Sequence, residues 1–297
     1  MSKYPSDKRC KVTILTIQTK KERREPITML TAYDYSSGLL VDRAGIDMIL
    51  VGDSLGMVML GYDSTVPVTM DDMLHHCRAT ARGARYAHLV GDLPFMSYQA
   101  STAEAIQNAG RILKQGSMDS VKLEGGREAA PTVRAIVNAG IPVMGHIGLT
   151  PQSVSKLGGY RVQGKTAAAA QRLFDDALEL EAAGCYAVVL EAIPAPVAEL
   201  ISQRLHIPTI GIGAGAGCDG QVLVYHDLLT LLDGCVAKFV KQYANVGDII
   251  SQTLTEYRDD VRHGHFPAAE HTYSMPDEEL DLFLQAVNAT EAAVSNL

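Results

Sequence analysis

Short apolar runs alternate with longer segments of helical pattern along most of this chain. The runs are nearly continuous in apolar residues, and a turn containing Gly or Pro follows each of them. Such runs indicate strands that are buried on both faces, and their alternation with helices indicates a parallel sheet. The predicted strands lie at residues 27–33, 47–54, 87–94, 120–126, 142–148, 186–193, 208–215 and 237–243.

The segments between these runs carry start and stop signals of helices. Thr69 and Thr166 stand where a hydroxyl side chain can cap a first helical turn. Gly184 follows the alanine-rich segment after Thr166, at the position where glycine often ends a helix. His75 and His76 fall inside the helix predicted after Thr69, and we expect them at the surface.

The repeated strand–helix unit predicts the fold class. Eight units fit an α/β fold with a (β/α)8 TIM barrel better than an open doubly wound sheet, which can hold as many strands. No linker or composition break interrupts residues 27–265, so we expect one catalytic barrel domain there. An N-terminal arm at 1–26 precedes it, and a C-terminal helical tail at 266–297 follows, with a helix beginning near Pro276.

Composition narrows the class of protein. Lys plus Arg number 26 against 34 Asp plus Glu, and a net charge of -8 argues against a nucleic-acid-binding scaffold. The 5 cysteines are widely spaced without a CxxC pair, which favours reduced thiols over disulfides or zinc. The polar N-terminus has no apolar core of a signal peptide, and no apolar stretch is long enough to span a membrane. These features predict a cytoplasmic enzyme.

Charged or titratable side chains recur where the predicted strands end. Taken singly, Asp53 and Asp92 could cap the next helix, and His146 could be a packed, hydrogen-bonded histidine. Their recurrence on five successive strands instead favours one shared site, because barrels place their active sites at the carboxyl ends of the strands. The residues concerned are Asp53, Asp92, Lys122, Glu124, His146 and Glu191.

The side chains at these ends indicate a metal-dependent reaction. Carboxylates without cysteine, and with a single histidine, suit Mg²⁺ or Mn²⁺ better than Zn²⁺. A 2-oxo acid could occupy part of such a site, where the metal would stabilise its enolate. Lys122 could pair with the substrate carboxylate, and a carboxylate outside the metal shell could remove the α-proton. The glycine-rich residues 211–217 are a weak signal, explained equally well by phosphate binding or by a close backbone approach.

Several motifs together identify a family. In order along the chain, from about residue 11 to 265, they are ITMLTAYDY, ILVGDSLGMVMLGYDSTVPVT, VGDLPFMSY, VKLEGG, GHIGLTPQS, VVLEAIP and IGIGAG. With these motifs the chain resembles the ketopantoate hydroxymethyltransferase (3-methyl-2-oxobutanoate hydroxymethyltransferase) family of pantothenate and coenzyme A biosynthesis. The tail after about residue 268 carries no matching motif.

The resemblance implies a barrel of the phosphoenolpyruvate-mutase and isocitrate-lyase kind. It implies a one-carbon transferase that passes a hydroxymethyl group from 5,10-methylenetetrahydrofolate to 3-methyl-2-oxobutanoate, giving 2-dehydropantoate through a Mg²⁺-stabilised enolate. Mn²⁺ or Co²⁺ is expected to serve as the metal cofactor in place of Mg²⁺. A homo-oligomer, often a decamer, is implied as well.

The resemblance also assigns roles to site residues. It makes Glu191 the catalytic base and makes Asp53, Asp92 and Glu124 the metal site, with Glu124 bound directly or through water. The residues assigned to the substrate are Asp53, Ser54, Asp92, Lys122 and His146.

Two alternatives stay open at this level. One is a Mg²⁺-dependent 2-oxo acid lyase or phosphonomutase on the same scaffold. Such enzymes commonly carry a cysteine motif such as KKCGH after the fourth strand, where this chain has VKLEGGREAAPTV. The other is an inactive barrel that only binds metabolites, against which the intact acidic residues argue.

Overall fold

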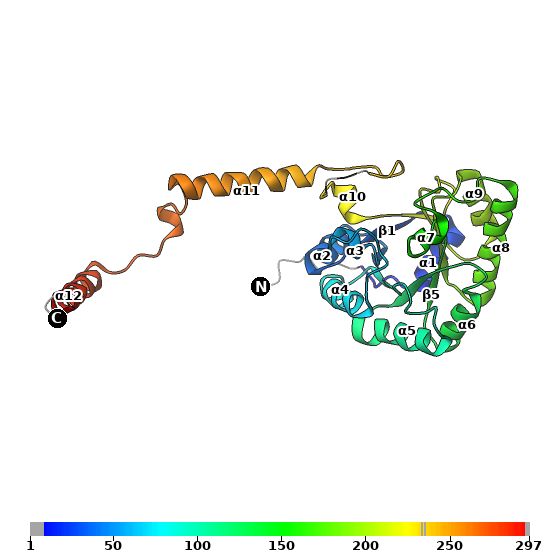
Figure 1. The fold of residues 1–297 in the computed structure, drawn as a ribbon, viewed down its shortest axis with the longest axis horizontal. Helices are drawn as coiled ribbons and strands as arrows, with labels where there is room; N and C mark the ends of the chain where they lie inside the picture. Colours follow the sequence, from blue (N-terminus) through cyan, green and yellow to red (C-terminus); the bar gives the residue numbers. More distant parts are fainter. Residues whose placement is uncertain (1–8, 233, 235, 295–297) are drawn as a thin grey trace. The chain divides into compact units, whose positions relative to one another are not determined.

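Eight parallel strands close into a barrel in the computed structural model, which describes residues 9–232, 234 and 236–294 (Figure 1). Each strand pairs with the next in sequence, and β8 pairs back with β1. The predicted (β/α)8 barrel is therefore confirmed. The strands are β1 Ile27–Thr31, β2 Met48–Val51, β3 His88–Asp92, β4 Ser120–Glu124, β5 Val143–Gly148, β6 Ala187–Glu191, β7 Thr209–Ile212 and β8 Gly220–Leu223.

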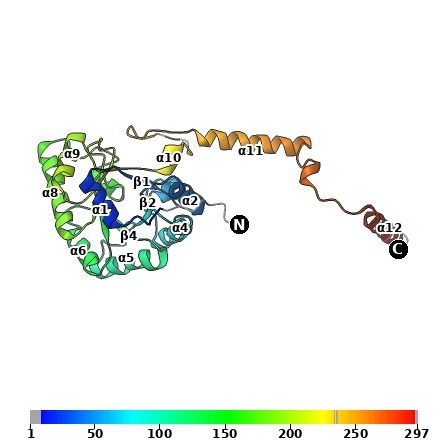
Figure 2. The same ribbon diagram turned by 180° about the vertical axis from the view of Figure 1, so that it is seen from behind.

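Helices surround the barrel, as Figures 1 and 2 show for α4, α5, α6, α8 and α9. Thr69 caps α4 and Thr166 caps α8, and Gly184 ends α8 with a φ of 100°, so these sequence signals are confirmed. The helices are α1 Ile14–Arg23, α2 Tyr35–Arg43, α3 Leu55–Val58, α4 Met70–Gly83, α5 Thr102–Gly116, α6 Ala130–Asn138, α7 Val154–Leu157, α8 Ala167–Ala183, α9 Ala195–Arg204, α10 Tyr225–Leu229, α11 Val246–His263 and α12 Asp277–Val294, with 3₁₀ turns η1 Pro151–Ser153 and η2 Ala269–His271.

The chain divides into two compact units, Met1–Ala244 and Asn245–Leu297. The first holds the whole barrel, and the second holds α11, η2 and α12. This division lies earlier than the limit of 265 expected for the barrel domain, which stays a prediction. The helix predicted near Pro276 is α12. None of the described helices combines the length and the apolar character that crossing a membrane requires.

The predicted eighth strand, 237–243, is wrong. This segment makes no strand, and most of its residues are exposed, whereas a barrel strand must be covered on both faces. The eighth strand is instead the four-residue β8, which pairs with both β1 and β7. Its sequence signal is weak because β8 begins with Gly220 and Gln221 and so has no continuous apolar run.

The expectation that both histidines of α4 lie at the surface is wrong for one of them. His75 is exposed, but His76 is buried and its Nδ1 lies 2.6 Å from the carbonyl oxygen of Tyr33. Neighbouring residues on a helix point in different directions, and the inward one here contacts the segment that follows β1.

Alternation along the strands separates two apolar clusters. One cluster fills the barrel with side chains such as Met29, Leu50, Val90, Met144 and Val189, and Ile17 of α1 joins it. The other cluster lies between the strands and the helices and contains the intervening strand residues, such as Leu89, Val121 and Leu190. A side chain two positions beyond a barrel-filling residue therefore also points toward the barrel axis.

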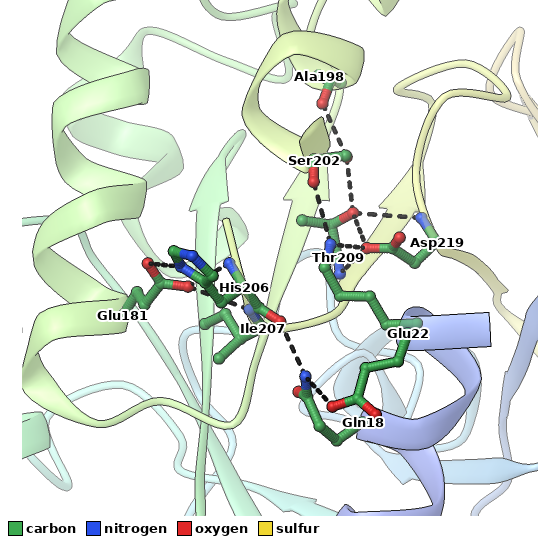
Figure 3. A network of polar contacts seen from close by, with 10 residues as sticks. Gln18, Glu22, Glu181, Ala198, Ser202, His206, Ile207, Thr209 and Asp219 are labelled. Carbon is green, nitrogen blue, oxygen red and sulfur yellow. Dashed lines mark hydrogen bonds and ion pairs between the residues drawn. The ribbon is translucent and has the colours of Figure 1, made fainter. Parts of the chain in front are cut away.

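The amino ends of three strands repeat one polar arrangement. Asp47, Asp119 and Asp219 each stand immediately before a strand and accept the backbone N–H of a residue on the preceding strand. Each also pairs with a lysine of the N-terminal arm, at N–O distances of 2.6 to 2.7 Å. Figure 3 shows Asp219 beside Thr209, whose N–H and hydroxyl it accepts at 2.8 and 2.9 Å. The arm is thereby fixed to the barrel.

We expect Asp219→Ala to lower the free energy of unfolding by about 2–3 kcal/mol. The substitution leaves the Thr209 N–H without its acceptor and leaves the Lys21 ammonium with the Ser202 carbonyl alone, and unsatisfied, partly buried donors cost roughly this much. Chemical denaturation measures the change. Asp71→Ala is the control, since it removes only an exposed ion pair with Arg111 and should cost under about 1 kcal/mol. Equal losses in both variants would contradict the structural role of Asp219.

Candidate active site

All the predicted site residues line one cavity of about 180 Å³. They come from the segment after β2 and from the carboxyl ends of β3, β4, β5 and β6. The structure thus brings together Asp53, Ser54, Asp92, Lys122, Glu124, His146 and Glu191. Their placement agrees with the sequence expectation, while their chemical roles are the subject of the proposal below.

Strand alternation explains why these polar side chains face the cavity. Asp92 stands two positions after Val90, His146 two after Met144, and Glu191 two after Val189, and the three apolar residues fill the barrel. Strand pairing then sets Lys122 beside Asp92, and His146 beside Glu124. Gly148 has a φ of 99°, and a side chain there would collide with the carbonyl oxygen of Glu191.

Lys122 is the buried cation of the cavity. Its Nζ lies 2.9 Å from Asp92 Oδ2 and its side chain is 4% exposed. Burial alone would lower the pKa of Lys122, but the charges of Asp92, Glu124 and Asp53 raise it above its ordinary value. The ammonium therefore stays protonated. Its ion pair is with Asp92, on the neighbouring strand, rather than with Glu124 on its own strand.

The carboxylates outnumber this cation. Burial, together with the charges of Asp92 and Glu124, raises the pKa of Asp53 well above its ordinary value. Burial and the charge of Glu124 also raise the pKa of Asp92, although Lys122 opposes them. Asp92 Oδ1 is buried without a hydrogen-bond partner among the described residues. Such an atom, in a cavity of surplus negative charge, fits an additional cation.

Asp53 and Asp92 bond to other segments of the barrel end rather than capping a following helix. Asp53 Oδ2 accepts from the side chain of Gln152 at 2.9 Å. Asp92 Oδ2 accepts from the backbone N–H of Asp53 at 3.3 Å and pairs with Lys122. The short helix α3 begins after Ser54 without a side-chain cap. The alternative reading of both residues as helix caps is therefore not supported.

His146 lies between two carboxylates. Its Nδ1 is 3.5 Å from Glu124 Oε1, and its Nε2 is 3.2 Å from Glu191 Oε2. Burial and Lys122 lower the pKa of His146, but Glu124 and Glu191 outweigh them and raise it to about 9. Its Nδ1 also lies 3.4 Å from the Lys122 Nζ, and its buried Nε2 makes no hydrogen bond with the described residues. The imidazole thus lies where it can orient the Glu191 carboxylate.

The donors present fit a magnesium ion, although no preformed cage exists. Within the part of the chain that the structure describes, no three His, Cys, Asp or Glu side chains are arranged to hold an ion together. Mg²⁺ does not need three, because it usually takes one or two carboxylates and completes its shell with water and substrate oxygens. Asp92 and Asp53 supply such carboxylates, and the unpartnered Asp92 Oδ1 supports this fit.

Sequence reasoning missed several cavity neighbours. Asp227 and Phe239 line the cavity from the segment after β8, which was overlooked because the eighth strand was misplaced. Tyr160 lines it from the segment after β5. Gly213 has a φ of 63°, and a side chain there would collide with the Phe239 ring, so the glycine signal reflects a close approach. Gln152 carries no charge and stood out only within the motif GHIGLTPQS.

A larger hollow, of about 770 Å³, lies elsewhere on the barrel unit and shares only a few wall residues with the small cavity. Among the described residues, the carboxylates that line this hollow are Glu25 and Asp219. The carboxylate of Asp219 already accepts hydrogen bonds from Lys21 and Thr209. The small cavity, with its buried and mutually perturbed groups, is the better candidate for the active site.

Comparison with known proteins shows the family of this chain. A family model described as ketopantoate hydroxymethyltransferase matches residues 11–269. The 3-methyl-2-oxobutanoate hydroxymethyltransferase of Moorella thermoacetica is 60% identical over 265 residues, which cover 89% of this chain and 98% of that protein. The protein of the same name from Syntrophus aciditrophicus is 56% identical, over 89% of this chain and 97% of its own length.

Solved structures share the fold at low identity. A phosphonopyruvate hydrolase is 13% identical with a TM-score of 0.57, over 95% of this chain and 98% of its own. Phosphoenolpyruvate phosphomutase from Streptomyces platensis subsp. rosaceus is 15% identical with a TM-score of 0.56, over 96% and 99%. At this identity the likenesses show a shared barrel fold. A further structure with this fold, a 2,3-dimethylmalate lyase with a TM-score of 0.55 and 13% identity, over 92% of this chain and 98% of its own, is described as a member of the phosphoenolpyruvate-mutase and isocitrate-lyase superfamily.

Proposed function

Since the chain belongs to the ketopantoate hydroxymethyltransferase family and is an enzyme that hydroxymethylates 3-methyl-2-oxobutanoate, we propose how its cavity performs this reaction. The one-carbon donor is 5,10-methylenetetrahydrofolate, and the reaction passes through an enolate of the oxo acid. The close relatives carry the hydroxymethyltransferase name, so the lyase or phosphonomutase alternative has no observation in its favour.

Asp53 and Asp92 hold a Mg²⁺ ion in this proposal, with Glu124 beside it directly or through water. Bound there, Mg²⁺ would supply a fixed positive charge next to the ketone oxygen of the oxo acid. The surplus of buried carboxylates over the single lysine is the observation that supports this assignment. Mn²⁺ or Co²⁺ should substitute, since both accept oxygen ligands.

Glu191 removes the proton from C3 of 3-methyl-2-oxobutanoate. Its carboxylate lines the cavity outside the group formed by Asp53, Asp92 and Glu124, and His146 lies 3.2 Å from it. His146 orients this carboxylate and lies near the new hydroxymethyl group. Lys122 holds the substrate carboxylate, and Ser54, whose hydroxyl lies 2.9 Å from that of Tyr33, contacts the oxo acid.

The carbon–carbon bond forms between C3 of the enolate and the methylene carbon of the folate. Water supplies the hydroxyl oxygen, and 2-dehydropantoate and tetrahydrofolate leave. Two routes complete this last step: hydrolysis of the folate adduct, or attack on a released formaldehyde equivalent. We also propose that the enzyme works in the cytoplasm as a homo-oligomer, a decamer by resemblance to its family, without nucleic-acid or membrane partners.

Hydrogen exchange at C3 tests the proposed enolisation. In D₂O, with Mg²⁺ and without folate, the protein should erase the C3 proton signal of 3-methyl-2-oxobutanoate in the proton NMR spectrum. EDTA should stop the exchange, and added Mg²⁺, Mn²⁺ or Co²⁺ should restore it. Full exchange by metal-stripped protein would refute the metal assignment, and turnover without any exchange would refute the enolate.

Lys122→Met should separate substrate binding from metal binding. Losing the buried ammonium should raise the KM for the oxo acid roughly 30-fold, because a lost charge partner costs about 2 kcal/mol. Affinity for Mn²⁺ should stay unchanged or increase, because a neighbouring positive charge has been removed. Steady-state kinetics and Mn²⁺ titration measure the two effects. An unchanged KM would make Lys122 a structural partner of Asp92 only.

A further inference from the structure

Gln152 is a buried amide that contacts several parts of the candidate site. It belongs to η1, in the segment after β5, and is 3% exposed. Its Nε2 donates to Asp53 Oδ2 and to the carbonyl oxygen of Leu93, each at 2.9 Å. Its Oε1 accepts from the Tyr98 hydroxyl at 2.7 Å. Every polar atom of the side chain is therefore engaged.

The same residue also contacts a second site carboxylate. The backbone N–H of Gln152 donates to Glu124 Oε2 at 3.1 Å. Tyr98, which donates to the Gln152 side chain, accepts the backbone N–H of Glu124 at 3.2 Å. Gln152 therefore holds two carboxylates from different parts of the barrel, Asp53 through its side chain and Glu124 through its backbone N–H. Tyr98 holds the Gln152 side chain in turn.

These contacts determine which way the amide points. The Asp53 carboxylate and the Leu93 carbonyl can only accept, so the nitrogen must face them and the oxygen must face Tyr98. The amide also leaves the charge of Asp53 intact, whereas a lysine ammonium in its place would add a positive charge that repels a divalent cation. A neutral donor restrains the carboxylate and preserves its attraction for a divalent cation.

We propose that Gln152 is a positioning residue that orients the carboxylates of Asp53 and Glu124 for a divalent cation. Tyr98 in turn fixes the Gln152 amide. The assignment rests on the metal site of the proposed function, but it concerns residues outside the set assigned to that site. Such supporting contacts typically change metal affinity by about 10–100-fold when they are removed.

Mn²⁺ binding without substrate, followed by electron paramagnetic resonance, tests this role in the full chain. Gln152→Met keeps the approximate volume and removes all side-chain hydrogen bonds, so the Kd for Mn²⁺ should rise about 10-fold or more. Ser202→Ala is the control, because Ser202 is also a buried polar residue but its hydroxyl donates to the Ala198 carbonyl within α9 and lies beside Thr209, away from the cavity. It should lower the melting temperature while leaving the Kd unchanged.

Further variants make the outcome decisive. Gln152→Asn, whose shorter side chain cannot span the same partners, should also weaken Mn²⁺ binding. Tyr98→Phe should weaken Mn²⁺ binding less than Gln152→Met does. Combined with Gln152→Met, it should raise the Kd for Mn²⁺ little further, since both substitutions remove the same hydrogen bond. Wild-type Mn²⁺ affinity in either folded Gln152 variant, or an equal loss in Ser202→Ala, would overturn the role of Gln152. Wild-type protein that binds no Mn²⁺ would overturn the metal site of the proposed function as well.

Discussion

Glu191→Gln should reduce turnover by roughly 10²-fold or more while leaving the binding of Mg²⁺ and 3-methyl-2-oxobutanoate nearly intact. Glutamine keeps the shape of the side chain but cannot accept the C3 proton. The structure places Glu191 in the cavity, next to His146 and outside the pair of carboxylates proposed to hold the metal. Steady-state kinetics and oxo-acid titration measure the two expectations.

Exchange of the C3 proton in D₂O distinguishes a base from a folate-positioning residue. If Glu191 is the base, exchange without folate falls in parallel with turnover. Glu181→Gln is the control, because Glu181 accepts backbone N–H groups of His206 and Ile207, away from the cavity (Figure 3), and should leave exchange unchanged. Undiminished exchange in Glu191→Gln would refute the assignment and would make His146 the next candidate.

Asp92→Asn should weaken Mn²⁺ and oxo-acid binding together, each by about 10²-fold. Asp92 contributes the unpartnered oxygen Oδ1 and also holds Lys122 with Oδ2, so one substitution affects both the cation and the substrate carboxylate. Losing one partner of a buried charge pair costs about 2–5 kcal/mol, which corresponds to such factors. Asp53→Asn should act in the same direction.

Asp42→Asn provides the comparison for this prediction. Asp42 is equally buried, but its carboxylate accepts the backbone N–H groups of Tyr86 and Ala87 and does not line the cavity. Its replacement should reduce stability and leave both affinities unchanged. Titration of each variant with Mn²⁺, with and without 3-methyl-2-oxobutanoate, separates the cases. Unchanged affinities in Asp92→Asn would reduce that residue to a structural partner of Lys122.

The position of most site residues followed from local rules. Strands buried on both faces are recognisable as continuous apolar runs, and a charged residue at the end of such a run is costly unless it faces a polar space. Four of the apolar runs contain such a titratable residue near the end, namely Asp92, Glu124, His146 and Glu191. A closed parallel barrel then places the carboxyl ends of its strands at the same rim. Period-two alternation alone then directs these side chains inward.

Other features depended on contacts between residues far apart in the chain. The pairing of β8 with β1 and β7 identifies the last strand, whose first two residues, Gly220 and Gln221, interrupt the apolar signal. The partner of Lys122 is Asp92 rather than Glu124, because the register between β3 and β4 decides which carboxylate lies beside it.

By itself, then, the sequence determined the barrel, the family and the residues at the strand ends, because these depend on local periodicity and on motifs. The tertiary structure alone decided the burial of His76 and the contacts of Gln152. Both are polar side chains whose burial becomes favourable only when distant segments supply their hydrogen-bond partners. The spacing of residues along the sequence does not predict such partners, because only the closed fold brings them within hydrogen-bonding distance.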